Sequence, residues 1–184
     1  MLVLDRSMSI DAGELTDLKN AANSFITALA PTPTGVHTGQ VSFSGAGTLD
    51  LHLTDVEADA HTAINALIAG GNTNLKEGIE LATGEMDNLH IHERPAVKDV
   101  MVIITDGIPN RPLPANTADD VAATAADNAR AAGIEVFVVG VGVSGSTETF
   151  LKTEIADDAS HYFAAIDFGD LQSILTGLTQ CQQP

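Results

Sequence analysis

Two nearly unbroken aliphatic runs constrain the fold of this chain more than any other feature. They are Asp99–Thr105 (DVMVIIT) and Ile134–Val141 (IEVFVVGV). A strand has this composition when both of its faces are covered, as happens inside a parallel sheet. An alanine-rich segment with helical spacing, Thr117–Ala132, lies between the two runs and ends at Gly133, a typical helix C-cap. The chain therefore contains at least one strand–helix–strand unit, which favours an α/β fold.

The remaining segments continue this alternation of strands and helices. Gln40–Phe43 and Thr48–Leu53 alternate polar and apolar residues across the short link Ser44–Gly47, so we expect an antiparallel hairpin at a sheet edge. Asp11 and Glu14 have the spacing of a capping box. The other expected strands are Leu2–Leu4 and His161–Ala164, and the other expected helices are Glu14–Ala30, Asp59–Ala69, Asn74–Leu89, Thr147–Ile155 and Asp167–Leu178.

These elements predict one domain over residues 1–184. Its fold class is α/β: a doubly wound, mostly parallel six-stranded sheet with one antiparallel edge strand and helices on both faces. A length of 184 residues suits one domain and is enough to bury a core. Only Leu2, Val3 and Leu4 follow Met1 before the first polar cluster, which is short for a buried strand. We therefore expect the chain to be excerpted from a longer protein.

The charge balance limits the partners that the chain can bind. It has 8 Lys and Arg against 25 Asp and Glu, a net charge of −17. A protein that binds nucleic acid must bring cations to the phosphates, so we expect no nucleic-acid partner. The same argument disfavours anionic membrane surfaces. No run of about 18 apolar residues occurs, so we also expect no membrane insertion. The single cysteine, Cys181, permits no internal disulfide.

Oxygen-bearing side chains follow the expected strands at the end where a doubly wound sheet binds ligands. Asp5, Ser7 and Ser9 alternate directly after the first strand, and Asp106 follows Thr105. Thr73 lies in a Gly-rich segment that precedes a helix. Two carboxylates and three hydroxyls form an all-oxygen ligand set, which suits Mg²⁺, Mn²⁺ or Ca²⁺ rather than zinc.

Each of these residues also has a simpler interpretation. Asp5 and Ser9 could cap the following helix, Thr73 could be an N-cap, and Asp106-Gly107 could form a simple turn. The metal-site interpretation gains from the order of the three segments and from their common position at one end of the sheet.

Taken together, the segments resemble a known site. Asp5-x-Ser7-x-Ser9, Gly-Asn-Thr73 and Thr-Asp106-Gly are similar to the metal-ion-dependent adhesion site (MIDAS) of von Willebrand factor A-type (vWA) domains. The order of strands and helices also resembles that family over nearly the whole chain. The resemblance implies that Ser7 and Ser9 bind the metal directly, Thr73 does so in a ligand-bound state, and Asp5 and Asp106 act directly or through water. Met8 stands where many members have Gly.

The resemblance also implies a function. The chain would be a non-enzymatic binding module for adhesion or assembly, with Mg²⁺ (or Mn²⁺ or Ca²⁺) as its cofactor. An exposed Asp or Glu of a protein partner would complete the coordination sphere. We expect an extracellular or cell-envelope location, within a larger surface or pilus-associated protein of a bacterium. In some family members binding is coupled to movement of the last helix, here Asp167–Leu178.

Two alternatives differ in class. The first is a cytoplasmic vWA subunit that assembles with an AAA-type ATPase or chelatase. The second is a hydrolase that uses the metal as a Lewis acid; against it, the loops at this end of the sheet contain no His, Lys or Cys as a base. A phosphatase of the haloacid dehalogenase type needs a second carboxylate where Ser7 stands. Phosphate-binding glycine loops are absent, so we expect no nucleotide cofactor.

A second group of potential metal ligands is His90-x-His92 with Glu93. It follows an expected helix and precedes Arg94-Pro95. We therefore interpret it as a solvated connecting loop rather than a metal pair.

Overall fold

The computed structural model describes residues 1–87, 90–114 and 117–181, which form a six-stranded sheet in the order β3-β2-β1-β4-β5-β6. β1 pairs in parallel with β2 and β4, and β5 pairs in parallel with β4 and β6. β3 lies antiparallel to β2 at one edge. This arrangement confirms the predicted fold class. The strands are β1 (Leu2–Asp5), β2 (Thr38–Phe43), β3 (Gly47–Thr54), β4 (Val100–Thr105), β5 (Glu135–Val141) and β6 (Tyr162–Ala165).

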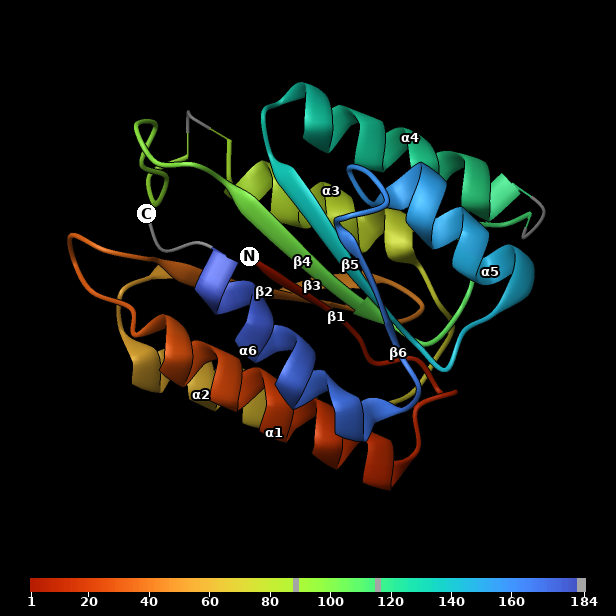
Figure 1. The fold of residues 1–184 in the computed structure, drawn as a ribbon. Helices are drawn as coiled ribbons and strands as arrows, with labels where there is room; N and C mark the ends of the chain where they lie inside the picture. The colour runs from red at the N-terminus through yellow and green to blue at the C-terminus, as the bar shows by residue number, and fades with distance from the viewer. Residues whose placement is uncertain (88–89, 115–116, 182–184) are drawn as a thin grey trace.

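Helices cover both faces of the sheet (Figure 1). On one face α1, α2 and α6 enclose a core that includes Leu4, Leu18 and Ile104. On the other face α3, α4 and α5 enclose a core that includes Val3 and Ile103. Neighbouring residues of β1 and β4 thus point into opposite cores, which explains their unbroken apolar sequences. The helices are α1 (Ala12–Leu29), α2 (Glu57–Asn65), α3 (Leu75–Glu85), α4 (Ala118–Ala131), α5 (Gly145–Phe150) and α6 (Leu171–Cys181).

The predicted capping box at the start of α1 is confirmed. The Asp11 carboxylate accepts hydrogen bonds from the backbone N–H groups of Gly13 (2.7 Å) and Glu14 (2.9 Å). The Glu14 carboxylate in turn accepts from the Asp11 N–H at 2.8 Å. The box satisfies backbone donors that a helix N-terminus leaves unpaired. It makes Ala12 the first helical residue and leaves residues 6–10 as a loop above the sheet.

Several predicted helices differ from the structure at their ends. α2 stops at Asn65 rather than Ala69, because Leu67 turns into the core and the Gly70 N–H donates to the Arg6 carbonyl at 2.8 Å. The predicted helix over 147–155 begins at Gly145 and finishes as a π-helix, Leu151–Ile155. The predicted last helix begins with a 3₁₀ turn, Phe168–Asp170. The predicted third helix, Asn74–Leu89, also ends earlier, at Glu85 with Met86 as its C-cap, and Leu89 itself lies outside the described residues.

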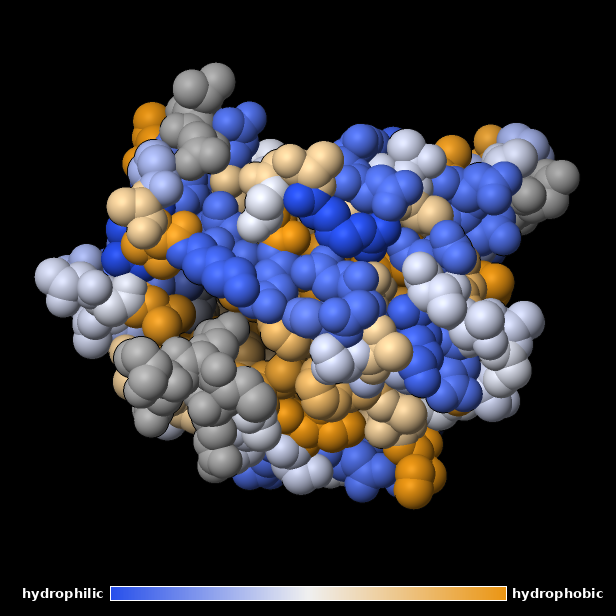
Figure 2. All heavy atoms as spheres, turned by 45° about the horizontal axis from the view of Figure 1, so that its top comes forward, coloured by the Kyte–Doolittle hydropathy of each residue, from blue (hydrophilic) through white to orange (hydrophobic). Residues whose placement is uncertain are grey.

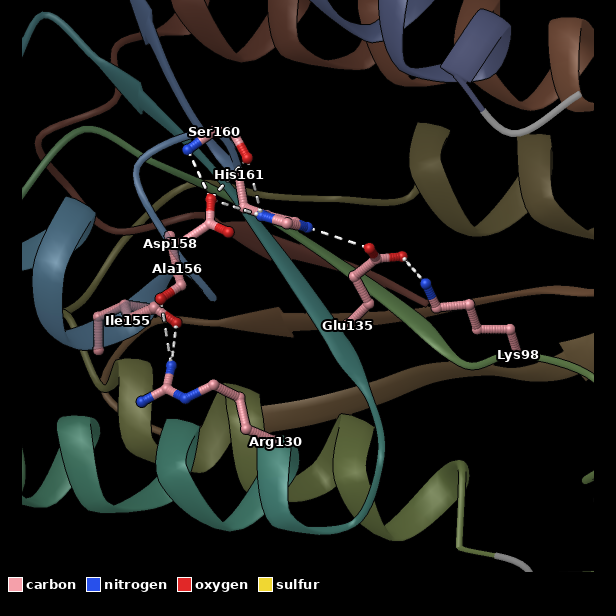
Figure 3. A network of polar contacts seen from close by, with 8 residues as sticks. All are labelled: Lys98, Arg130, Glu135, Ile155, Ala156, Asp158, Ser160 and His161. Carbon is pink, nitrogen blue, oxygen red and sulfur yellow. Dashed lines mark hydrogen bonds and ion pairs between the residues drawn. The ribbon is translucent and has the colours of Figure 1, made fainter.

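Polar contacts connect side chains beside β5 and β6, and a separate set connects α4 to the end of the π-helix (Figure 3). His161 lies between two carboxylates, with Nε2 3.0 Å from Glu135 and Nδ1 2.9 Å from Asp158. Glu135 also pairs with the Lys98 ammonium at 2.7 Å. Arg130 of α4 donates to the carbonyl of Ile155 at 2.7 Å, which satisfies an acceptor at the end of the π-helix.

The face of the molecule shown in Figure 2 is largely hydrophilic, with smaller hydrophobic areas between the polar ones. This pattern accords with the high proportion of acidic residues. Among the helices of the described residues, none has both the length and the hydropathy needed to cross a membrane.

Candidate metal site

Three loops meet at the carboxyl end of the central strands. β1 and β4 are parallel neighbours, so the loops that follow them leave the sheet side by side. The segment between α2 and α3 lies against the first of these loops, because the Met8 N–H donates to the Gly71 carbonyl at 3.1 Å. Gly71 has a φ of +87°, a conformation that glycine adopts without the steric cost of a Cβ atom. The expected convergence of the three segments is therefore present in the backbone.

Asp5 lies at the base of this region and is completely buried. Its Oδ1 accepts a hydrogen bond from the Ser7 N–H at 2.8 Å, and its Oδ2 accepts one from the Thr105 hydroxyl at 2.6 Å. Burial raises the pKa of Asp5 to about 6, although both hydrogen bonds act in the opposite direction. Asp5 does not cap α1, since Asp11 does. The fold thus buries a carboxylate that a nearby cation would stabilise as an anion.

Three further side chains form a connected row of oxygens beside Asp5. The Ser7 and Ser9 hydroxyls are 2.9 Å apart, and the Ser9 hydroxyl donates to Asp106 Oδ1 at 3.0 Å. Ser7 is buried, Ser9 is exposed and Asp106 is half-buried. Partial burial raises the pKa of Asp106, opposed by the hydrogen bond from Ser9. We call Asp5, Ser7, Ser9 and Asp106 the oxygen cluster; it runs from the buried sheet end to the surface.

Thr73 lies on the adjoining loop and is held there by its backbone. Its N–H donates to Asn110 Oδ1 at 3.1 Å, and its carbonyl accepts from the Asn110 N–H at 2.9 Å. Thr73 is not the N-cap of α3, because Asn74 takes that position and accepts from the Glu77 N–H. Within the described residues, no hydrogen bond joins the Thr73 side chain to the oxygen cluster. Its role as a fifth ligand stays a prediction.

Two residues that sequence reasoning missed support these positions. Thr105 was expected as the last residue of a buried strand and as part of the Thr-Asp106-Gly segment, without a role of its own, yet its hydroxyl donates to Asp5. Asn110, four residues beyond Asp106, ties the β4–α4 loop to Thr73. A hydroxyl at the end of an aliphatic strand is the one signal that could have indicated Thr105.

The donor set and its spacing fit a hard divalent cation. All the donors are carboxylate or hydroxyl oxygens, which Mg²⁺ and Mn²⁺ prefer. Adjacent ligands of an octahedral Mg²⁺ ion, with bonds of about 2.1 Å, are about 3 Å apart. The separations from Ser7 to Ser9 and from Ser9 to Asp106 are 2.9 and 3.0 Å. These three oxygens could therefore occupy neighbouring corners of one octahedron with little movement.

Exposed hydrophobic side chains lie on loops at the same end of the sheet as the cluster. Met8, between the two serines, is 76% exposed, and Ile68, on the loop before Thr73, is 77% exposed. Ile166, directly after β6, is 86% exposed. Ile108 and Leu113, on the loop after Asp106, are exposed as well. Exposed large apolar side chains on the same side of a molecule as a polar site favour a surface that binds another protein.

Comparison with known proteins bears on the family and the fold. The family model of the von Willebrand factor type A domain matches residues 1–177. The vWF domain of the type V pili tip protein Mfa5 from Porphyromonas gingivalis superposes with a TM-score of 0.83 at 13% identity, covering 98% of this chain and 93% of that chain.

Proximal thread matrix protein 1 from the mussel byssus gives a TM-score of 0.82 at 21% identity over 97% of this chain. This chain spans about half of that protein (46%). Another structure of the mussel protein, with a TM-score of 0.80, 21% identity and the same coverage of both chains, has a zinc-occupied MIDAS motif. At these identities the superpositions establish the fold, whereas the family model matches the sequence itself over nearly its whole length. The chain therefore belongs to the von Willebrand factor type A domain family.

Proposed function

We propose that the chain is a divalent-cation-dependent protein-binding module for adhesion or assembly, and not an enzyme. Its cation, Mg²⁺ or Mn²⁺ with Ca²⁺ as a further option, would be held by Asp5, Ser7, Ser9, Thr73 and Asp106. The observation that carries the proposal is the row of hydroxyl and carboxylate oxygens about 3 Å apart beside the buried Asp5 carboxylate.

The hydrogen bonds suggest different roles for the five residues. Ser7 and Ser9 are assigned as direct ligands, and Thr73 as a ligand once a partner is bound. Both oxygens of Asp5 already accept hydrogen bonds, so we assign Asp5 a role through water and through its charge. Asp106 binds directly or through water. The neutral hydroxyls leave the cation with uncompensated charge, which an acidic group of a partner can neutralise.

The surroundings of the site favour a macromolecular partner with an exposed Asp or Glu. With a net charge of −17, the chain repels acidic partners in general, so the cation would be the main attraction for a carboxylate. The exposed Met8 and Ile68 would add apolar contact around it. Such a partner would bind only while the metal is present.

The non-enzymatic assignment rests on the chemistry of the site. The oxygen cluster contains carboxylates and hydroxyls, and the nearby Arg6 and Arg111 donate to Ser42 and Asn72. The Ser9 hydroxyl donates to the Asp106 carboxylate, but the cluster contains no His, Lys or Cys to act as the base or nucleophile of a hydrolase. The names of the similar structures, a pilus tip protein, a byssal matrix protein and a pilus adhesin, SpaC from Lactobacillus rhamnosus GG (TM-score 0.79, 14% identity, 98% of this chain, 30% of that chain), point to the same class.

The same names support an extracellular or cell-envelope location within a larger protein, and the two pilus names favour a bacterial surface protein. The alternative is a cytoplasmic subunit that assembles with an AAA-type ATPase through the same site. The two differ in where the partner is found. Capture from separated envelope and cytoplasmic fractions of the host distinguishes them.

The test compares Mg²⁺ binding and partner capture in three proteins. Calorimetry should give one Mg²⁺ per chain for the parent and a loss of binding for Ser7→Ala/Ser9→Ala. Ser173→Ala, which removes an exposed helix hydroxyl on α6, should behave like the parent. Capture of acidic surface proteins should need Mg²⁺ and fail with EDTA. Equal Mg²⁺ binding by the serine double variant and the parent would refute the site, and capture that survives EDTA would refute the metal-dependent mechanism.

A further inference from the structure

Three of the six histidines of the chain gather around one buried carboxylate, away from the oxygen cluster. His52 lies on β3, Glu85 is the last residue of α3, and His90 and His92 follow that helix. β3 is antiparallel to β2, and Leu51 pairs with Gln40, which in turn pairs with Leu2 at the start of β1. His52 is therefore at the amino end of β1, whereas Asp5 is at its carboxyl end.

We propose that His52, Glu85 and His90 form a second metal site, selective for a first-row transition cation such as Zn²⁺. We call these three residues the histidine cluster. The interpretation of His90-x-His92 as a solvated connecting loop misses this contact, because His52 and Glu85 come from distant parts of the sequence. The proposal does not depend on the proposed function of the oxygen cluster.

The ligand atoms are already close together. Glu85 Oε2 lies 2.9 Å from His52 Nδ1 and 3.4 Å from His90 Nε2, and the ligand atoms of the three side chains all lie within 4.8 Å of one another. Tetrahedral zinc with bonds of about 2.1 Å holds its ligand atoms about 3.4 Å apart. The two histidine–carboxylate separations are therefore within about half an ångström of those needed. The two histidine nitrogens, at most 4.8 Å apart, would also have to approach each other, which requires rotation of the exposed His52 side chain.

The carboxylate is oriented as a metal ligand usually is. The Glu85 side chain is only 1% exposed, and its second oxygen, Oε1, accepts a hydrogen bond from the Leu53 N–H at 2.9 Å. This bond fixes the carboxylate and leaves Oε2 directed at the two histidines. In the described residues the side-chain partners of Glu85 are histidines, without a Lys or Arg. A neutral imidazole compensates a buried negative charge poorly, whereas a divalent cation would compensate it fully.

The third histidine packs against the site. The His92 ring stacks on His52 with centroids 4.7 Å apart and lies 5.2 Å from the His90 ring. Its backbone N–H contacts His90 Nδ1 at 3.4 Å. A metal on His90 Nε2 would leave the proton on Nδ1, so this long, weak contact would be given up. We assign His92 a positioning role, and leave the fourth coordination position to water.

The donor types separate this site from the oxygen cluster. Imidazole nitrogens suit Zn²⁺, Cu²⁺ and Ni²⁺, whereas Mg²⁺ and Ca²⁺ prefer oxygen. Occupation would also link the edge strand β3 to the end of α3, so the cation would raise the unfolding temperature. The two sites should then respond to different metals in the same chain.

The test is a Zn²⁺ titration of the full chain, purified without a metal-affinity tag, in a Ser7→Ala/Ser9→Ala background that removes both hydroxyls of the oxygen cluster. We expect one Zn²⁺ per chain and a rise in unfolding temperature. Adding His52→Ala/His90→Ala should lower the affinity by at least about 100-fold and abolish the rise. Glu85→Gln, which keeps the side-chain shape, should also weaken binding.

His61→Ala is the matched control. His61 also contacts a carboxylate, that of Glu57 at 3.1 Å, but this contact involves one histidine rather than two. It should leave zinc binding unchanged. Unchanged zinc affinity in the His52/His90 variant would overturn the proposal. Loss of all zinc binding in the Ser7/Ser9 background would place zinc at the oxygen cluster, which also overturns the proposal but leaves the proposed function intact. Mg²⁺ binding by chains with an intact oxygen cluster should not change on His52→Ala/His90→Ala.

Discussion

The hydroxyl of Thr105, the last residue of β4, donates a 2.6 Å hydrogen bond to the carboxylate of Asp5, the last residue of β1. Both residues are fully buried. The bond crosses between two adjacent parallel strands and holds the carboxylate beneath Ser7 and Ser9. The central strands thus position the base of the candidate metal site directly, through a residue that is not itself a proposed ligand.

We expect Thr105→Val to weaken Mg²⁺ binding by roughly 10-fold to 100-fold, the usual effect of losing a partner that orients a ligand. Valine has nearly the same shape, so the strand should survive while Asp5 loses one of its two donors. Calorimetric titration measures the change. Thr124→Val, on the exposed side of α4, removes a hydroxyl bound only to the Asp120 carbonyl and should have no effect. Equal affinities in the two variants would show that Thr105 does not orient Asp5.

Two glycines of α3 should respond in opposite directions to replacement by alanine. A Cβ on Gly78 would lie 2.8 Å from a Phe43 ring carbon and 3.2 Å from Val3, in the packed core beneath the sheet. We expect Gly78→Ala to lower the free energy of unfolding by about 1–3 kcal/mol. A Cβ on Gly84 meets nothing within 4 Å. Gly84→Ala should raise stability by about 0.5–1 kcal/mol, because alanine favours the helix. Urea unfolding of both variants checks the contrast, which equal destabilisation would contradict.

The contacts of His161 should make stability depend on pH. Burial alone would lower the pKa of His161, but its hydrogen bonds to Asp158 and Glu135 raise the pKa above the usual 6.5. A raised histidine pKa gives stability that is present below pH 6.5 and is lost as the pH rises through the folded value. Hydrogen bonds from Ser160 and His161 lower the pKa of Asp158, so its contribution is present above pH 3.8 and is lost in acid.

The network in Figure 3 should therefore stabilise the fold most between about pH 4 and 6.5. His161→Gln should reduce the free energy of unfolding more at pH 5 than at pH 8. Urea unfolding of the parent and the variant at both pH values gives the two differences. A difference that does not change with pH would mean that His161 contributes by packing alone, for example against the Phe137 ring.

The sequence predicted what local patterns determine. β4 and β5 could be predicted because burial on both faces leaves them apolar except at Thr105 and Glu135, which lie at the strand ends. The start of α1 could be predicted because a capping box needs only Asp11 and Glu14. The order of the elements then placed Asp5 and Asp106 at one end of the sheet. The C-terminal end of α2 was not predictable in this way. It depends on Leu67, which packs into the core, and on Gly70, whose N–H donates to the carbonyl of Arg6, far away in the chain.

The features that the sequence did not predict depend on contacts between distant segments of the chain. The Thr105 hydroxyl and the Asn110 side chain support the site through partners 100 and 37 residues away. His52 alternates outward on an edge strand, and Glu85 ends a helix, so neither pattern indicated that they meet. The order of the segments in the chain predicted that the loop with Thr73 lies near this end of the sheet. That Asn74 rather than Thr73 caps α3 became clear only from the structure.

Asp106→Asn tests whether Asp106 is a metal ligand or only one charge of a generally acidic surface. The test is needed because the chain has a net charge of −17, which could attract Mg²⁺ without a specific site. Asparagine keeps an oxygen that can accept from Ser9, now 3.0 Å away, but removes one negative charge beside the cation. A unit charge within a few ångströms of a divalent ion contributes several kcal/mol at an effective dielectric constant of about 20, so Mg²⁺ affinity should fall at least about 100-fold.

The control variant Asp59→Asn makes the same change in net charge in the first turn of α2, at an exposed position near the other end of the sheet. At physiological salt, where the screening length is about 8 Å, it should change the affinity by less than about 2-fold. Comparable losses in both variants, measured by calorimetry in the same buffer, would mean that Mg²⁺ binds the acidic surface diffusely and that Asp106 is not a ligand.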